Sequence, residues 1–157
     1  MRMRHGLVVA FGLMTVITPL FAQAPETFTA RLSWVPIGGS ERTDVTGDGS
    51  VTATLSGSKL SIAGSFEGLP AKATGAKIHQ GVATGARGRG LAIADLRVTG
   101  ETGGTSGTVS GDLRLSAEQL AALKAGQLYL QIYSEKGVLP DHSTLWGWLL
   151  QERGAHQ

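Results

Sequence analysis

Cysteine is absent from the 157-residue sequence, which excludes disulfide bonds, thiolate catalysis and metal sites with cysteine ligands. Histidine is scarce as well, with four in the whole chain. His156 lies in the C-terminal tail, so a site with three histidine ligands would need that tail to converge with His79 and His142. His79 and His142 can still combine with a carboxylate such as Asp141. No Gly-x-Ser-x-Gly nucleophile motif is present, and we expect no catalytic residue, no metal ion and no cofactor.

The N-terminal two dozen residues have the three parts of a signal peptide. Met1–His5 is short and basic, an apolar run extends from Gly6 to about Phe21, and small residues occupy positions 22–24. The run is shorter than the ~20 apolar residues that cross a bilayer comfortably. We predict a cleaved signal peptide within residues 1–24, a secreted or periplasmic protein, and no stable membrane anchor after cleavage.

The cleavage position is predicted from the small residues and from the proline that follows them. Cleavage after Ala24 would place Pro25 directly after the scissile bond. Proline has no N–H and a fixed φ, which hinders binding to the peptidase. We therefore favour cleavage after Ala22, followed by a folded domain over residues 25–152 and a flexible tail over residues 153–157.

Charge is balanced once the leader is removed. The full chain has 14 Lys and Arg against 12 Asp and Glu, and loss of Arg2 and Arg4 leaves 12 of each sign. No basic stripe remains, so we expect no nucleic-acid partner.

Alternation of polar and apolar residues between glycine-containing turns predicts short antiparallel strands. In the first strand, one face carries Phe28, Ala30, Leu32 and Trp34. A hairpin follows, in which strands over residues 51–55 and 60–66 flank a turn over residues 56–58. Further strands are expected at Gly75–His79, Leu91–Val98, Thr105–Leu115, Gln127–Ser134 and Thr144–Gln151.

One short helix is expected between the strands at Thr105–Leu115 and Gln127–Ser134. Ser116 can cap it, Gln119 can complete a capping box, and Gly126 ends it. Its inner stripe is expected to contain Leu120, Ala121 and Leu123. About eight strands with one short helix favour a sandwich or a barrel over any β-α-β arrangement.

Two glycine-rich segments are candidate ion sites. Asp44–Ser50 places oxygen ligands at alternate positions, as a calcium loop does, but the twelfth position needs a bidentate carboxylate and is Leu55. Gly85–Gly90 contains two arginines and could form a nest of backbone amides for an anion, but it lacks the Lys-Ser/Thr end of a phosphate loop. Turns between strands explain both segments more simply.

Five segments, in order along the chain, match the pattern of a known family. They are Phe28–Leu32, Gly64–Pro70, Ala76–Gly81, Leu128–Ser134 and Ser143–Leu149. Together they resemble the chordin-type domain, called CHRD. The resemblance implies an extracellular β-sandwich with no established catalytic activity. We therefore predict an all-β fold, an antiparallel β-sandwich of immunoglobulin-like, Greek-key type, with about eight strands and one short helix before the penultimate strand.

The sequence departs from the CHRD pattern at four positions. Lys77 and Tyr133 stand where the pattern has histidines, and Trp146 and Trp148 stand where it has Arg and Gln. Side chains alternate along a strand, so the two tryptophans share one face. We predict a binding surface made of Trp146, Trp148, Tyr129 and Tyr133, rimmed by Lys77 and His79. The alternative is that these rings are ordinary core residues.

The predicted function is that of a secreted, CHRD-like binding or interaction module without catalytic activity. Its expected ligand is an extracytoplasmic protein or a carbohydrate, because aromatic rings on a rigid sheet recur in sites for sugars and peptides. The alternative is an extracytoplasmic enzyme, supported by a metal or a cofactor and centred on the strand that carries His79.

Overall fold

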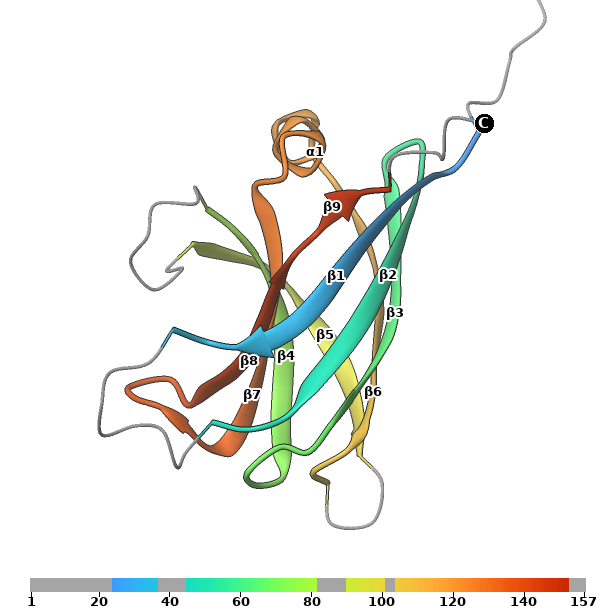
Figure 1. Ribbon diagram of the computed structural model, residues 1–157. Helices are drawn as coiled ribbons and strands as arrows, with labels where there is room; N and C mark the ends of the chain where they lie inside the picture. Colours follow the sequence, from blue (N-terminus) through green and yellow to red (C-terminus); the bar gives the residue numbers. More distant parts are fainter. Residues whose placement is uncertain (1–23, 37–44, 82–89, 101–103, 153–157) are drawn as a thin grey trace, which may run out of the picture.

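The computed structural model describes residues 24–36, 45–81, 90–100 and 104–152 (Figure 1). The predicted signal peptide, the predicted tail and most of the Gly85–Gly90 segment lie outside these residues. Within them, no helix is long and apolar enough to cross a membrane.

Within the described residues, the chain forms strands and one helix, which comes late in the sequence (Figure 1). In order, these elements are β1 (Glu26–Trp34), β2 (Asp48–Ser56), β3 (Lys59–Glu67), β4 (Ala73–Gln80), β5 (Leu91–Gly100), β6 (Gly107–Arg114), α1 (Ala117–Lys124), β7 (Leu128–Val138), β8 (Ser143–Trp148) and β9 (Leu150–Gln151). The predicted hairpin is confirmed, because β2 and β3 pair around a turn in which Gly57 has a φ of +60°. The candidate calcium loop leads into a strand, as expected, because β2 begins at Asp48; Asp44 lies outside the described residues.

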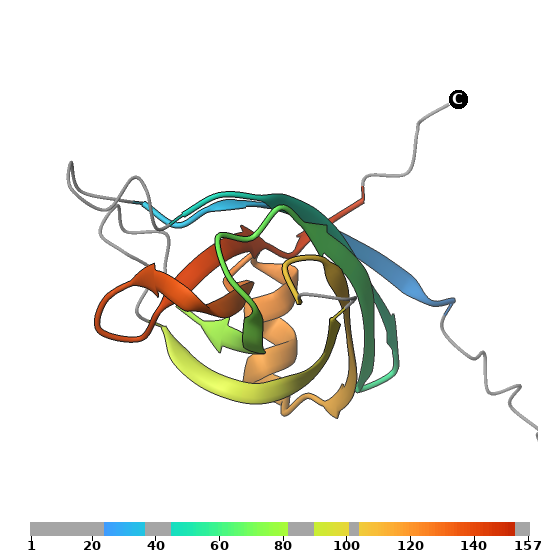
Figure 2. The ribbon, with the colours of Figure 1, turned by 90° about the horizontal axis from the view of Figure 1, so that it is seen from below.

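The strands close into a barrel, so the predicted sandwich is wrong. The sheet runs β2-β3-β6-β5-β4-β7-β8-β1, and β1 also pairs with β2, which joins the two ends (Figure 2). β1 closes the barrel because it pairs with both ends of the sheet. Most of its length pairs with β2, from Glu26 opposite Leu55 to Leu32 opposite Gly49, and its last residues pair with β8. Closure leaves no open edge along β1 or β2, where unpaired backbone groups would otherwise remain.

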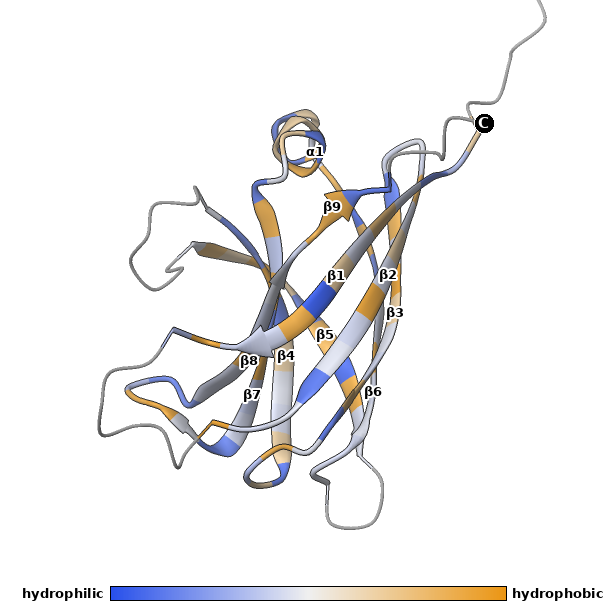
Figure 3. Ribbon diagram, viewed as in Figure 1, coloured by the Kyte–Doolittle hydropathy of each residue, from blue (hydrophilic) through white to orange (hydrophobic). Residues whose placement is uncertain are grey.

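Apolar side chains from alternate strand positions fill the interior of the barrel. Figure 3 shows the alternation of polar and apolar residues along the strands. The buried core includes Phe28, Leu32, Leu60, Ile62, Ile78, Val109, Leu128, Leu130, Ile132 and Leu145. This pattern follows from the two-residue period of a strand, which sends successive side chains to opposite faces.

Helix α1 lies across one end of the barrel (Figures 1 and 2). It begins with the predicted capping box, in which Ser116 Oγ accepts from Gln119 N–H and the Gln119 side chain accepts from Ser116 N–H. The predicted inner stripe is partly wrong: Leu123 is buried, but Ala122 is buried in place of the exposed Ala121. Docking against the barrel end therefore uses a face rotated by one residue from the predicted one.

Candidate binding site

Strands β4, β7 and β8 are neighbours in the barrel, and their outward side chains lie in register. One row across the three strands contains His79, Tyr129 and Trp148. The next row contains Lys77, Gln131 and Trp146, and a third pairs Gly75 with Tyr133. The inward residues of β7, by contrast, belong to the barrel core. All six predicted binding residues therefore gather on one outer face.

The aromatic rings on this face pack directly against one another, and we call them the aromatic cluster: His79, Tyr129, Tyr133, Trp146 and Trp148. His79 stacks on Tyr129 with ring centroids 5.0 Å apart and an interplanar angle of 10°. Trp148 meets Tyr129 edge-on at 5.0 Å, and Trp146 does so at 5.8 Å. The two tryptophans contact each other at 5.7 Å, also edge-on. Such edge-to-face pairs are the favoured geometry between aromatic quadrupoles.

Exposure differs within the cluster, so only part of the predicted binding surface is accessible. Tyr129 is 0% exposed and His79 is 8% exposed, whereas Trp146, Trp148 and Tyr133 are partly buried. Trp146 also packs against a small second core formed by Val35, Val45 and Val138. Tyr129 therefore serves as the buried centre of the cluster, and the other rings supply its accessible part.

Gly90, the residue before β5, is held by two side chains of the cluster. His79 Nδ1 lies 3.0 Å from Gly90 O, and Gly90 N–H donates to Tyr129 Oη at 2.8 Å. A carbonyl oxygen can only accept a hydrogen bond, so Nδ1 of His79 carries a proton. In a neutral imidazole the other nitrogen is then an acceptor, and the Tyr133 hydroxyl donates to Nε2 at 2.8 Å.

Both tyrosines of the cluster resist ionisation. Burial raises the pKa of Tyr129 above its ordinary value of 10.0, although the hydrogen bond from Gly90 opposes this shift. Burial also raises the pKa of Tyr133, and the negative charge of Asp141 adds to the effect. Both phenols therefore remain protonated over the physiological range of pH.

A pocket of about 440 Å³ opens beside the cluster. Its lining comes from β4, β5, β7 and the turn after β7: Thr74, Gly75, Lys77, His79, Ala92, Tyr133 and Asp141. Three of these were predicted as binding residues, namely Lys77, His79 and Tyr133. Ala92 faces His79 because the β4–β5 register shifts between Ile78 and His79, which no sequence pattern indicated.

Charges around the pocket come from Lys77 and two carboxylates. Lys77 Nζ forms an ion pair of 2.8 Å with Asp95 on the neighbouring strand β5. Asp141 is exposed, and its Oδ1 accepts a hydrogen bond of 3.3 Å from Ser143 N–H. The described residues contain no group of three His, Cys, Asp or Glu that could hold a metal ion, so the suggested set of His79, His142 and Asp141 is not assembled as one site there.

The hairpin between β7 and β8 fixes the position of Asp141. Ser134 and Thr144 are buried, and their hydroxyl oxygens lie 2.9 Å apart. Ser134 Oγ also donates to the carbonyl of Lys136, while Ser134 N–H donates to the carbonyl of His142 at 3.2 Å. These bonds tie the two sides of the hairpin together close to its tip, so the carboxylate is carried by a structured turn.

A family model for the CHRD domain matches residues 28–137. The chain belongs to the CHRD domain family. This confirms the resemblance drawn from the sequence, and membership points to a binding or interaction module. No curated protein and no solved structure matches the chain.

The matched part of the CHRD domain contains only some of the site. It includes His79, Tyr129 and Tyr133, but it ends before Asp141 and the two tryptophans of β8. In this CHRD domain, the lining of the pocket therefore comes both from the matched segment and from the part of the chain that follows it.

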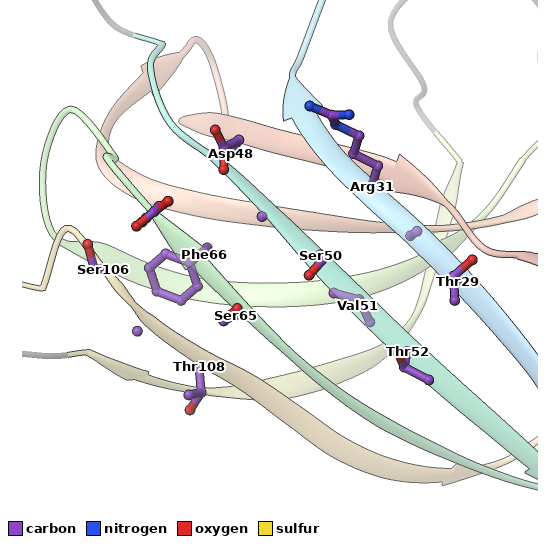
Figure 4. Close-up of a pocket in the computed structure, with 14 residues that line it drawn as sticks. Thr29, Arg31, Asp48, Ser50, Val51, Thr52, Ser65, Phe66, Ser106 and Thr108 are labelled. Atoms are coloured by element: carbon purple, nitrogen blue, oxygen red, sulfur yellow. The ribbon is translucent and has the colours of Figure 1, made fainter.

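A second, larger depression of this CHRD domain, of about 800 Å³, runs over β1, β2, β3 and β6 (Figure 4). Its exposed lining includes short polar side chains such as Ser50, Thr52, Ser65 and Thr108, with Arg31 at one side. No pair of aromatic rings lines it, and short hydroxyl side chains are typical of a solvated sheet surface. The pocket beside the aromatic cluster is therefore the stronger candidate.

Proposed function

We propose that this CHRD domain is an extracytoplasmic binding module without catalytic activity, and that the pocket beside the aromatic cluster holds its ligand. The observation that carries the proposal is the hydrogen-bonded wall of the pocket. Tyr133 and His79 are fixed by their mutual bond of 2.8 Å, and His79 is fixed again by Gly90. Groups held in one orientation lose little conformational entropy on binding, which favours specific recognition.

Binding fits the state of His79 better than acid–base catalysis does. Both ring nitrogens are engaged by groups of the protein, so the imidazole orients its neighbours. Tyr133 has a raised pKa, the opposite of what a phenolate base requires. These features support a site that recognises a ligand and leaves it unchanged.

The site of action is proposed from the sequence. The basic, apolar and small segments within residues 1–24 have the order of a cleaved export signal, and the chain contains no cysteine whose oxidation state would depend on the compartment. An extracytoplasmic protein or a carbohydrate accordingly remains the proposed partner.

The proposal is tested by mapping small probes onto the protein by NMR. A panel of amines, carboxylates and monosaccharides is titrated into ¹⁵N-labelled protein, and we expect backbone shifts that cluster on β4 and β7 around the pocket. The variant Thr74→Arg places a long side chain at the exposed rim of the pocket and should abolish those shifts. Its matched control, Thr52→Arg, does the same in the depression of Figure 4 and should leave them unchanged. Shifts that cluster in that depression, or no shifts with any probe, would contradict the proposal.

A further inference from the structure

We infer that the pocket takes the ammonium group of its ligand, bound between the hydroxyl oxygen of Tyr133 and the carboxylate of Asp141. This inference rests on the proposed function, because it names the chemistry of the group that the same pocket would hold. A lysine side chain and an amino sugar are two sources of such a group.

While His79 is neutral, the Tyr133 hydroxyl can only accept a hydrogen bond from a ligand. Gly90 O requires a proton on His79 Nδ1, which leaves Nε2 of the neutral ring as an acceptor. The single proton of the Tyr133 hydroxyl is therefore used in the bond of 2.8 Å to Nε2. The lone pairs of the oxygen remain, and an N–H donor of a ligand satisfies them, whereas a carboxylate or a phosphate would meet them with lone pairs of its own.

Asp141 supplies the second acceptor and the charge. It lines the same pocket as Tyr133, and one of its oxygens is used by Ser143 N–H, which leaves the other for a ligand. Lys77, which also lines the pocket, has its charge paired with Asp95 at 2.8 Å. The described pocket residues therefore present one carboxylate without an ion-pair partner among them.

An ammonium group matches this combination better than a neutral hydroxyl does. It carries three N–H donors and one positive charge, so it can donate to both oxygens and offset the charge of Asp141. The electrostatic surroundings of Tyr133 agree, since Asp141 and Asp95 both act to raise its pKa, as negative charges do. The ring of Tyr133 adds an aromatic surface toward which a cation is attracted.

The experiment compares three probes of the same length by NMR titration of the purified protein: n-butylammonium, n-butanol and butyrate. We expect n-butylammonium to shift the pocket resonances at concentrations at which the other two do not. Nα-acetyl-lysine methylamide, glucosamine and the neutral N-acetylglucosamine then distinguish a peptide source from a sugar source of the amine. Butyrate is essential as the probe of opposite charge, because a pocket that takes an anion would bind it in preference to n-butylammonium.

Two variants test the two oxygens separately. Asp141→Asn keeps the oxygen that accepts from Ser143 N–H and removes the charge, so it should fold normally and weaken amine binding about tenfold. Tyr133→Phe keeps the ring and removes the acceptor, with a loss of about threefold to tenfold expected. Asp112→Asn, at an exposed carboxylate paired with Lys59 on other strands, is the control and should bind as the parent does.

The outcomes separate the inference from the proposed function. Binding of butanol as strong as that of butylammonium, stronger binding of butyrate, or amine binding unchanged in both variants would overturn the ammonium inference and leave a binding pocket in place. If no probe shifts the pocket resonances, both the inference and the proposed function are wrong.

Discussion

The variant Gly90→Ala tests whether the hydrogen bonds of Gly90 to His79 and Tyr129, which we call the clamp, order the site. A Cβ atom at this position would lie 2.2 Å from Gln80 O, 2.6 Å from Gln80 C and 3.0 Å from Tyr129 Cε1. The first two atoms belong to the backbone of β4 and cannot rotate away. The variant Gly90→Ala must therefore move the start of β5 away from β4.

The cost of Gly90→Ala can be worked out from the contacts that this movement breaks. The hydrogen bonds to His79 Nδ1 and Tyr129 Oη are lost or lengthened, at about 1 kcal/mol each. Crowding against fixed atoms adds about 1–3 kcal/mol. We expect the free energy of unfolding to fall by about 3 kcal/mol or more.

Gly75 provides the matched control for this measurement. It lies on β4 in the same pocket wall, but a Cβ atom there would meet nothing within 4 Å. Gly75→Ala should leave stability unchanged or raise it by about 0.4–1 kcal/mol, because alanine restricts the unfolded chain. Urea unfolding of both variants and the parent measures the difference. If the two variants unfold within about 0.5 kcal/mol of each other, the clamp does not order the site as described.

Three further predictions concern processing, ionisation and packing. The intact mass of the exported protein should correspond to cleavage after Ala22, and a mass that begins at Pro25 would show that the proline argument fails. The chain has two tyrosines, both in the aromatic cluster, so tyrosinate absorbance should be missing near pH 10.0 in the folded protein and present there in denaturant. Because these folded-state pKa values are raised, the contribution of the two tyrosines to stability should be complete well below pH 10.0 and be lost as the pH rises above it, so stability should fall there less steeply in Tyr133→Phe; an equal slope would contradict the assignment. Trp146→Ala should lower the free energy of unfolding by about 2–3 kcal/mol through lost contacts with Tyr129 and the Val35 cluster, and a change under about 0.5 kcal/mol would show that this packing does not stabilise the fold.

Several features of the site could be predicted because they depend on local pattern. The alternation along β7 and β8 placed Tyr129, Tyr133 and the two tryptophans opposite the core residues, and the structure brings these rings together. His79 could be placed beside them only through the family pattern. Its partner Gly90 gave no sequence signal, because a glycine in a turn looks the same whether or not its peptide group is clamped.

Two pocket residues were not among the predicted binding residues, although Asp141 was considered as a carboxylate partner of His79, and tertiary pairing brings both into the pocket. Asp141 reaches the pocket through the turn between β7 and β8, and Ala92 reaches it through a shift of register beside His79. Exposure could not be predicted either. Tyr129 is fully buried on the outer face of a barrel, where a strand pattern predicts solvent, because its neighbours on β4 and β8 cover it.

The sequence by itself determined the strands, the capped helix and the family, because these depend on side-chain period, on residues close together in the chain and on ordered motifs. It could not decide between a sandwich and a barrel. Both architectures need the same alternation of apolar and polar residues, and they differ only in whether the first and last strands of the sheet meet. The pairing of β1 with both β2 and β8 makes this fold a barrel. The same closure fixes which outer side chains become neighbours, and so it also decided where the pocket lies.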